Sequence, residues 1–213
     1  MRHMTGSVYA RFDKPVHMFR GETMAGIIAD EAANNPDRGF VGGYYMETLS
    51  LGPSFLAAFI EPGAWGPEFA AMMDAYANTA GMWIVGEDMP QASNRITLSA
   101  TVKDQWGLAA PNVHFDDHAN DTAMRDYAYA KAQKLYETVG AVSSHRTPPY
   151  PSTHNLGTCR MSEKPEDGVV DKWGRAHEVP NLFVPDGAVM TTGAIVRSSF
   201  RRQANSIELS GRE

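Results

Sequence analysis

The chain has 213 residues, of which 43% are hydrophobic and 21% are charged. This composition is typical of a globular protein and excludes an intrinsically disordered chain. The net charge of −6, and basic residues that are scattered apart from Arg197, Arg201 and Arg202, argue against a nucleic-acid-binding protein.

The sequence does not assign the chain to a cellular compartment. Residues 1–9 lack the apolar core of a signal peptide, and no apolar run approaches the ~20 residues that cross a bilayer. Cys159 is the only cysteine, so an internal disulfide is excluded. Residues 6–12 (GSVYARF) are typical of a strand, and two alternatives remain for Met1: a short ordered start, or an internal point of a once longer chain.

The first third of the chain predicts two helices and a strand. Residues 23–33 have the apolar spacing of a short amphipathic helix, which Asn34, Asn35 and Pro36 would end. The aromatic and β-branched run 40–51 predicts a strand. Pro53, Pro62 and Gly63 indicate loops before a second helix over 67–81. That helix would begin with Pro67 at its first position and bury the following side chains: Phe69, Met72, Met73 and Tyr76.

The next part predicts short strands and one long helix. Strands are expected over 82–87 and 94–98, joined by a turn at 90–93, and over 112–115. A helix is expected over 120–139 with Gly140 as its end. Its apolar stripe would comprise Met124, Tyr127, Ala128, Ala132, Leu135 and Val139.

These elements lack a βαβ rhythm, so the fold class predicted is α+β, with a mostly antiparallel sheet and helices packed on one side. The proline-rich run 147–151 (TPPYP) indicates an extended segment leaving the sheet domain. We therefore divide the chain into a sheet domain (1–146), a C-terminal segment (147–194) and a tail (195–213). Residues 180–186 predict a strand separate from the main sheet, with an exposed apolar edge.

The cluster His114-Phe-Asp-Asp-His118 admits two interpretations. Two imidazoles and two carboxylates within five residues are suitable ligands for a divalent metal. The alternative is a strand end followed by a helix N-terminus, where Asp116 and Asp117 complement the helix dipole. Because no further Cys or His ligands cluster nearby in sequence, we assign no metal site.

Four linked elements follow the proline-rich run. They are STHNLGTCRMS (152–162), GVVDKWG (168–174), VPNLFVPDG (179–187) and TTGA (191–194). This order resembles the C-terminal signature of the glucose-methanol-choline (GMC) oxidoreductases, which oxidise alcohols with FAD. Residues 83–98 also resemble the family's substrate-domain strands. The similarity covers most of residues 6–194, and within the family it is closest to bacterial gluconate 2-dehydrogenase-like flavoprotein subunits.

The resemblance implies a substrate-binding sheet domain and a C-terminal segment that would complete an FAD-binding domain. It places His154 at the position of the general base that removes the hydroxyl proton while hydride leaves carbon, a role suited to imidazole. It places Asp186 and Gly187, after a strand with Leu182, Phe183 and Val184 as its core, where the chain approaches the flavin. Taken alone, each of these residues has an ordinary structural explanation.

Two departures from the family pattern concern the cofactor and the tail. No G-x-G-x-x-G fingerprint for the FAD pyrophosphate occurs in these 213 residues, so we expect FAD not to be retained by this chain alone. The family continues after the position of Ala194 with a segment that carries its second catalytic Asn or His. Here residues 195–203 (IVRSSFRRQ) contain neither.

The sequence thus leaves two hypotheses. The first is the C-terminal part of an FAD-dependent oxidoreductase acting on the CH–OH group of an alcohol, polyol or sugar acid. Its partners would be a separate FAD-domain chain or an electron-acceptor subunit, and no nucleic acid. The alternative is an inactive truncated fragment or a non-catalytic binding module.

Overall fold

A computed structural model describes residues 1–60, 63–149 and 152–193, and these residues form two compact units. The sheet unit contains the described residues of 4–87 and 120–152. The loop unit contains residues 1–3, 88–119 and the described residues from 153 onward. The chain therefore passes between the units several times, and neither unit is a continuous stretch of sequence.

The sheet unit is built on a five-stranded sheet in the order β2-β3-β4-β1-β7. Its strands are β1 (Met4–Arg11), β2 (Ile27–Ile28), β3 (Tyr44–Thr48), β4 (Thr79–Gly86) and β7 (Ser143–Arg146). Every described pairing in it is antiparallel. Strand β1 is interior, and Val8, Tyr9 and Ala10 are at most 2% exposed, so the sheet is covered on both faces there.

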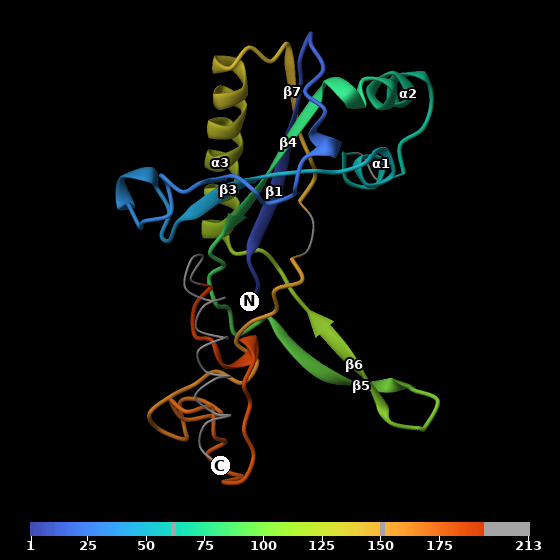
Figure 1. Cartoon of the computed structure of the whole chain (residues 1–213). Coiled ribbons are helices and arrows are strands. Elements are labelled where there is room, and N and C mark those ends of the chain that lie inside the picture. The colour runs from blue at the N-terminus through green and yellow to red at the C-terminus, as the bar shows by residue number, and fades with distance from the viewer. Residues whose placement is uncertain (61–62, 150–151, 194–213) are drawn as a thin grey trace. The chain divides into compact units, whose positions relative to one another are not determined.

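Helices pack against both faces of this sheet (Figure 1). On one face, α3 (Ala119–Thr138) lies so close to β1 that a side chain at Gly6 would meet the ring of Tyr129. On the other face, Tyr9 packs with Met72 of α2 (Pro67–Asp74). Because Gly6 and Tyr9 alternate along the strand, they point to opposite faces. The expectation of helices on one side only is therefore wrong, whereas the α+β class and the antiparallel sheet are confirmed.

The remaining helical elements of the described chain are short. They are α1 (Pro53–Ile60) and four 3₁₀ turns: η1 (Met18–Arg20), η2 (Pro36–Arg38), η3 (Tyr76–Asn78) and η4 (Gly187–Val189). Among the described residues, no helix is long and apolar enough to cross a membrane.

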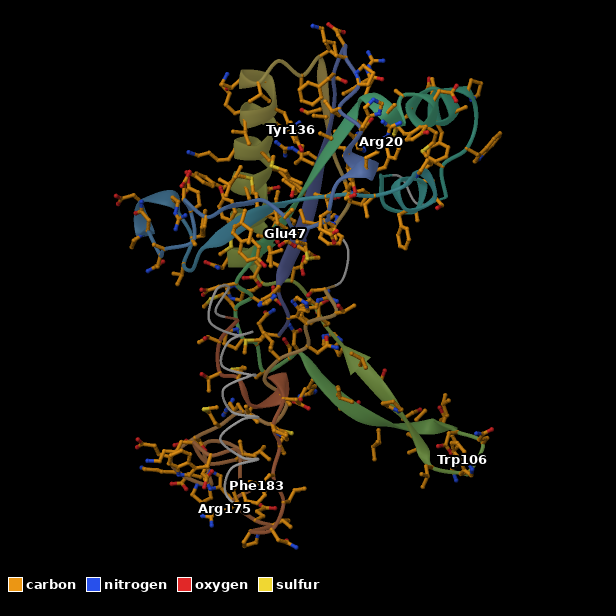
Figure 2. All side chains as sticks on the ribbon, viewed as in Figure 1. Arg20, Glu47, Trp106, Tyr136, Arg175 and Phe183 are labelled. Atoms are coloured by element: carbon orange, nitrogen blue, oxygen red, sulfur yellow. The ribbon has the colours of Figure 1, made fainter. Side chains whose placement is uncertain are left out.

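The described residues of the loop unit contain the hairpin of β5 (Arg95–Lys103) and β6 (Ala109–His114), besides the short turn η4. Its strands pair antiparallel and are almost entirely exposed. Trp106, labelled in Figure 2, lies in the turn between them and is 77% exposed. Residues 153–193 form loops around a small core of Val170, Ala176 and Val189.

Several predicted elements are confirmed. The predicted helix 120–139 is α3, and Gly140 follows it with a φ of 88°, the left-handed conformation typical of a helix end. The predicted strands 40–51, 82–87, 94–98 and 112–115 correspond to β3, β4, β5 and β6 with shifted bounds. Pro67 begins α2 as expected.

Two helix predictions and one loop prediction were wrong in part or whole. Residues 23–33 form no helix. Ile27 instead pairs with Glu47 of β3, and Ile28 pairs with Met46. The loop predicted after Pro53 contains α1. The helix expected to reach residue 81 ends at Asp74 because the chain from Thr79 pairs with β1, and α2 buries none of its side chains fully.

Two further predictions fail on burial and pairing. Val139 is 60% exposed, so it does not belong to the buried stripe of α3, whereas Met124, Ala128 and Ala132 do. Residues 180–186 form no strand, since only Phe183 makes an isolated bridge, to Arg175. Leu182 and Phe183 are about half exposed rather than core residues. This segment does lie outside the main sheet, as predicted.

The first prediction concerns the buried stripe of α3. Met124 is fully buried and lies close to Gly86 of β4, so Met124→Ala should lower the free energy of unfolding by ~2–5 kcal/mol. Val139→Ala, the control at the exposed end of the predicted stripe, should change it by less than ~0.5 kcal/mol. Urea denaturation followed by circular dichroism measures both. Equal effects would show that α3 does not pack as described.

The second prediction concerns Glu47, a carboxylic acid of β3 that is only 7% exposed (Figure 2). Desolvation by burial raises its pKa. Its stabilising contribution is therefore complete below the pKa of the unfolded chain and is lost as pH rises through the native pKa.

Glu47→Gln should consequently gain stability relative to the wild type as pH rises from 4 to 7. Urea denaturation at several pH values measures this difference. Glu137→Gln, at an exposed acid of α3, serves as control and should show no comparable trend. A Glu47→Gln difference that is constant with pH contradicts the prediction.

Candidate active site

Three distant segments of the loop unit come together around the predicted motif. Met1 and Leu156 exchange two hydrogen bonds, from the Leu156 amide to the Met1 carbonyl (2.9 Å) and from the Met1 amino group to the Leu156 carbonyl (3.2 Å). On the other side, Gly157, Cys159 and Met161 donate to the carbonyls of Gly187, Ala188 and Val189 at 2.9–3.2 Å. The loop after His154 is thus held between Met1 and residues 187–189.

Gly157 lies at the turn between Leu156, which pairs with Met1, and the residues that pair with 187–189. Its φ is 83°, a conformation that side chains with a Cβ adopt only with strain. A Cβ added there would lie 3.2 Å from the Met190 carbonyl oxygen. Both the backbone conformation and the close packing therefore favour glycine at this position.

His154 has an exposed side chain on this held loop. Its Nδ1 lies 2.9 Å from Nδ1 of His3, at hydrogen-bonding distance. The two rings are 5.0 Å apart between centroids and nearly perpendicular, with an angle of 84°. His154 is therefore accessible to a small molecule while one of its ring nitrogens is fixed by a second histidine.

His3 is buried, with 4% of its surface exposed. Its Nε2 lies 2.7 Å from the carbonyl oxygen of Gly193. The neighbouring Arg2 donates its amide to the carboxylate of buried Asp88 (2.7 Å), and its guanidinium lies 3.7 Å above the ring of Phe115. These contacts hold the beginning of the chain in place beside the motif.

Asp186 and Gly187 lie on the segment that neighbours the loop of His154. Asp186 is exposed, and its Oδ1 accepts a hydrogen bond from the Ala188 amide at 2.6 Å, which caps η4. Gly187 is buried, and its carbonyl accepts from both Gly157 and Met190. The structure thus brings both residues to the segment beside the His154 loop, and Asp186 is the one that solvent reaches.

Other residues singled out in the sequence have structural partners. Arg160, the arginine of the STHNLGTCRMS element, donates from Nε to the Asp167 carbonyl oxygen at 2.7 Å. His114 pairs with Asp116 at 3.0 Å, with both side chains exposed. In the described part of the chain, no group of three or more His, Cys, Asp or Glu side chains is arranged to hold a metal. The divergent residues 195–203 lie outside the described residues.

His3 is the residue of this site that sequence reasoning missed. It precedes His154 by 151 positions and stands in no recognisable motif. The only available signal was the strand-like character of residues 6–12, which placed an ordered element just after His3. Pattern alone does not say that this beginning returns to the STHNLG motif.

Comparison with known proteins identifies the family of the chain. The sequence model of the GMC oxidoreductases matches residues 90–204, more than half of the chain, and the chain therefore belongs to the GMC oxidoreductase family, in the C-terminal part of that family. This confirms the resemblance drawn from residues 152–194.

Individual relatives share this family. The chain is 36% identical over 168 residues to 2-methyl-1,2-propanediol dehydrogenase of Mycolicibacterium austroafricanum. This alignment covers 75% of this chain and 30% of the relative. The chain is 28% identical over 204 residues to the gluconate 2-dehydrogenase flavoprotein of Pantoea cypripedii, covering 86% of this chain and 33% of the relative. The chain thus spans about a third of the length of these relatives.

A solved structure shares the fold. Pyridoxine 4-oxidase from Mesorbium loti superposes with a TM-score of 0.55 at 16% identity, covering 99% of this chain and 43% of that one. At this identity the likeness concerns the fold alone.

The third prediction tests whether the held loop sets the position of His154. Gly157→Ala should strain the turn and shift the NMR signals of the His154 ring, because the added Cβ meets the Met190 carbonyl. Gly107→Ala is the matched control. Gly107 also has a positive φ, 85°, in the same unit, but open space surrounds its Cβ position. If both variants leave the His154 signals unchanged, the loop does not position this side chain.

Proposed function

We propose that this chain is the C-terminal, substrate-side part of an FAD-dependent oxidoreductase that acts on the CH–OH group of an alcohol, polyol or sugar acid. His154 is the general base. The observation that carries the proposal is an exposed imidazole on a loop held by backbone hydrogen bonds on both sides. The name of one relative supports a diol as substrate class, and that of another supports a sugar acid.

The chemistry follows from the oxidation of an alcohol. A carbinol carbon gives up hydride only as its hydroxyl loses a proton, because the product is a carbonyl. An imidazole at hydrogen-bonding distance from the hydroxyl accepts that proton, and general-base catalysis of this kind contributes about 10²–10⁴-fold to rate. Bound FAD would supply the hydride acceptor.

The described residues fit the substrate side of an FAD site and not its pyrophosphate side. His154 and Asp186 are exposed on neighbouring segments that Gly157 and Gly187 bring together. The glycine fingerprint that holds the pyrophosphate does not occur in the sequence. In this proposal, Asp186 and the backbone at Gly187 lie toward the flavin, and the pyrophosphate is held by residues outside this sequence.

Those residues belong either to a longer form of the same polypeptide or to a separate FAD-domain chain. An electron acceptor for bound FAD, either a small molecule or an acceptor subunit, would then be a further partner. The alternative function, a binding module without catalysis, shares the exposed site but needs no proton transfer.

The fourth prediction tests the base. In an active protein that contains these residues together with an FAD-binding part, His154→Ala should lower turnover by about 10²–10⁴-fold. It should slow the bleaching of the flavin absorbance by substrate in anaerobic stopped-flow experiments to the same extent, since that signal reports the oxidation step itself.

The control is His114→Ala, which removes an exposed histidine of the β5–β6 hairpin and should leave turnover within about two-fold of the wild type. Full activity of the His154→Ala protein would rule out the general-base role. Saturable binding of an alcohol without any flavin reduction would favour the binding module.

A further inference from the structure

We propose that His3 is a positioning residue that fixes the tautomer of His154, so that the lone pair of His154 lies on Nε2 and its proton on Nδ1. The tautomer follows from the geometry of this chain alone. Its catalytic meaning rests on the function proposed above for His154.

The argument begins at Gly193. A carbonyl oxygen can only accept a hydrogen bond, and Nε2 of His3 lies 2.7 Å from that of Gly193. Nε2 of His3 therefore carries a hydrogen. A neutral imidazole has one N–H and one lone pair, so Nδ1 of neutral His3 holds the lone pair and accepts.

The next step passes through the contact between the rings. Nδ1 of His154 lies 2.9 Å from Nδ1 of His3, and a hydrogen bond needs one donor and one acceptor. Because Nδ1 of His3 is the acceptor, Nδ1 of His154 is the donor. Neutral His154 then has its lone pair on Nε2. A single backbone carbonyl thus determines the proton positions of two side chains.

The placement of His3 makes this assignment rigid. The ring is 4% exposed, which removes water as a competing partner for most of its surface. The residues before it are fixed by the Met1–Leu156 pair and by the Arg2 amide bond to Asp88. A buried acceptor held from several directions loses little entropy when it makes the hydrogen bond.

For the proposed reaction, this tautomer is the competent one. The O–H bond of the substrate breaks, its proton forms an N–H bond at Nε2 of His154, and the ring becomes an imidazolium. Nδ1 keeps its hydrogen throughout and continues to donate to His3, which stabilises the charged ring. A third group that orients the base in this way is a recurring feature of catalytic histidines, usually in the form of a carboxylate.

The experiment is a long-range ¹H–¹⁵N NMR spectrum of the uniformly labelled chain, at a pH at which both rings are neutral. Such spectra distinguish the two neutral tautomers by which ring nitrogen carries the hydrogen. The chain has seven histidines, and His3→Gln and His154→Gln assign the two signals by their disappearance. The expected result is an Nε2–H tautomer for His3 and an Nδ1–H tautomer for His154. An Nε2–H tautomer for His154 in the wild type overturns the proposal.

Two variants of His3 separate positioning from simple packing. A glutamine amide can reach the place of Nε2 and donate to Gly193, but it offers no acceptor at the place of Nδ1. An asparagine oxygen can occupy the place of Nδ1 and accept from His154. His3→Gln should therefore reduce the ratio of Nδ1–H to Nε2–H His154 by about 2- to 10-fold, the worth of one neutral hydrogen bond, and His3→Asn should restore part of it.

If His3→Gln keeps the spectrum of a folded protein and the ratio of His154 tautomers is unchanged, the proposal is also overturned. If both variants unfold, the wild-type tautomers still decide the question. In the FAD-containing protein, His3→Gln should lower kcat by a similar factor and leave KM within about two-fold.

Failure of this inference and failure of the proposed function give different results. If His154→Ala is inactive but the tautomer of His154 does not depend on His3, the base is correct and its positioning is not. If the tautomers are as described but His154→Ala retains full activity, the pair exists and the general-base role is wrong.

Discussion

The hydrogen bonds between Met1 and Leu156 constrain the rest of the candidate site, because they place the beginning of the chain beside a loop that follows it by about 150 residues. Residues 153–162 contain no helix or long strand. The backbone groups of such a stretch need partners, and for Leu156, its buried residue, an unpaired amide would cost ~1–3 kcal/mol. The described pairs with Met1 on one side and with residues 187–189 on the other satisfy several of them. Through these pairs an irregular loop acquires the fixed position that a catalytic side chain requires.

In the proposed function, the pair of His3 and His154 is an example of how neutral groups would organise a base. A carboxylate beside a catalytic histidine stabilises its charged form strongly and must itself be compensated when it is buried. A neutral imidazole accepts the same hydrogen bond with no charge to bury. The second ring nitrogen of His3 is also paired, with the Gly193 carbonyl, so burying this imidazole leaves little polar surface without a partner.

The two units differ in the physical basis of their stability. In the sheet unit, β1 and α3 carry fully buried apolar side chains, among them Val8, Met124 and Ala128. The described residues of the loop unit have a smaller apolar core, around Val170 and Val189, and an exposed hairpin. Their order depends more on backbone hydrogen bonds and on turns such as Gly157. Regions of this kind open at lower free energy than a packed sheet, and binding sites are commonly found in them.

The sequence by itself determined the features that depend on interactions within one short segment. Apolar spacing and Gly140 predicted α3, since 3.6-residue periodicity and a glycine end are properties of one segment. The order of the STHNLG, VPNLFVPDG and TTGA elements identified the GMC family, and it predicted His154 as the candidate base. Periodicity misassigned residues 23–33, where pairing with β3 outweighed a weak helical pattern, and residues 180–186, where strand-forming residues have no ladder to join. Only the tertiary structure placed α2 and α3 on opposite faces of β1, and only it brought His3 to His154. Contacts between residues 151 positions apart depend on how the whole chain is threaded, and no local pattern carries that information.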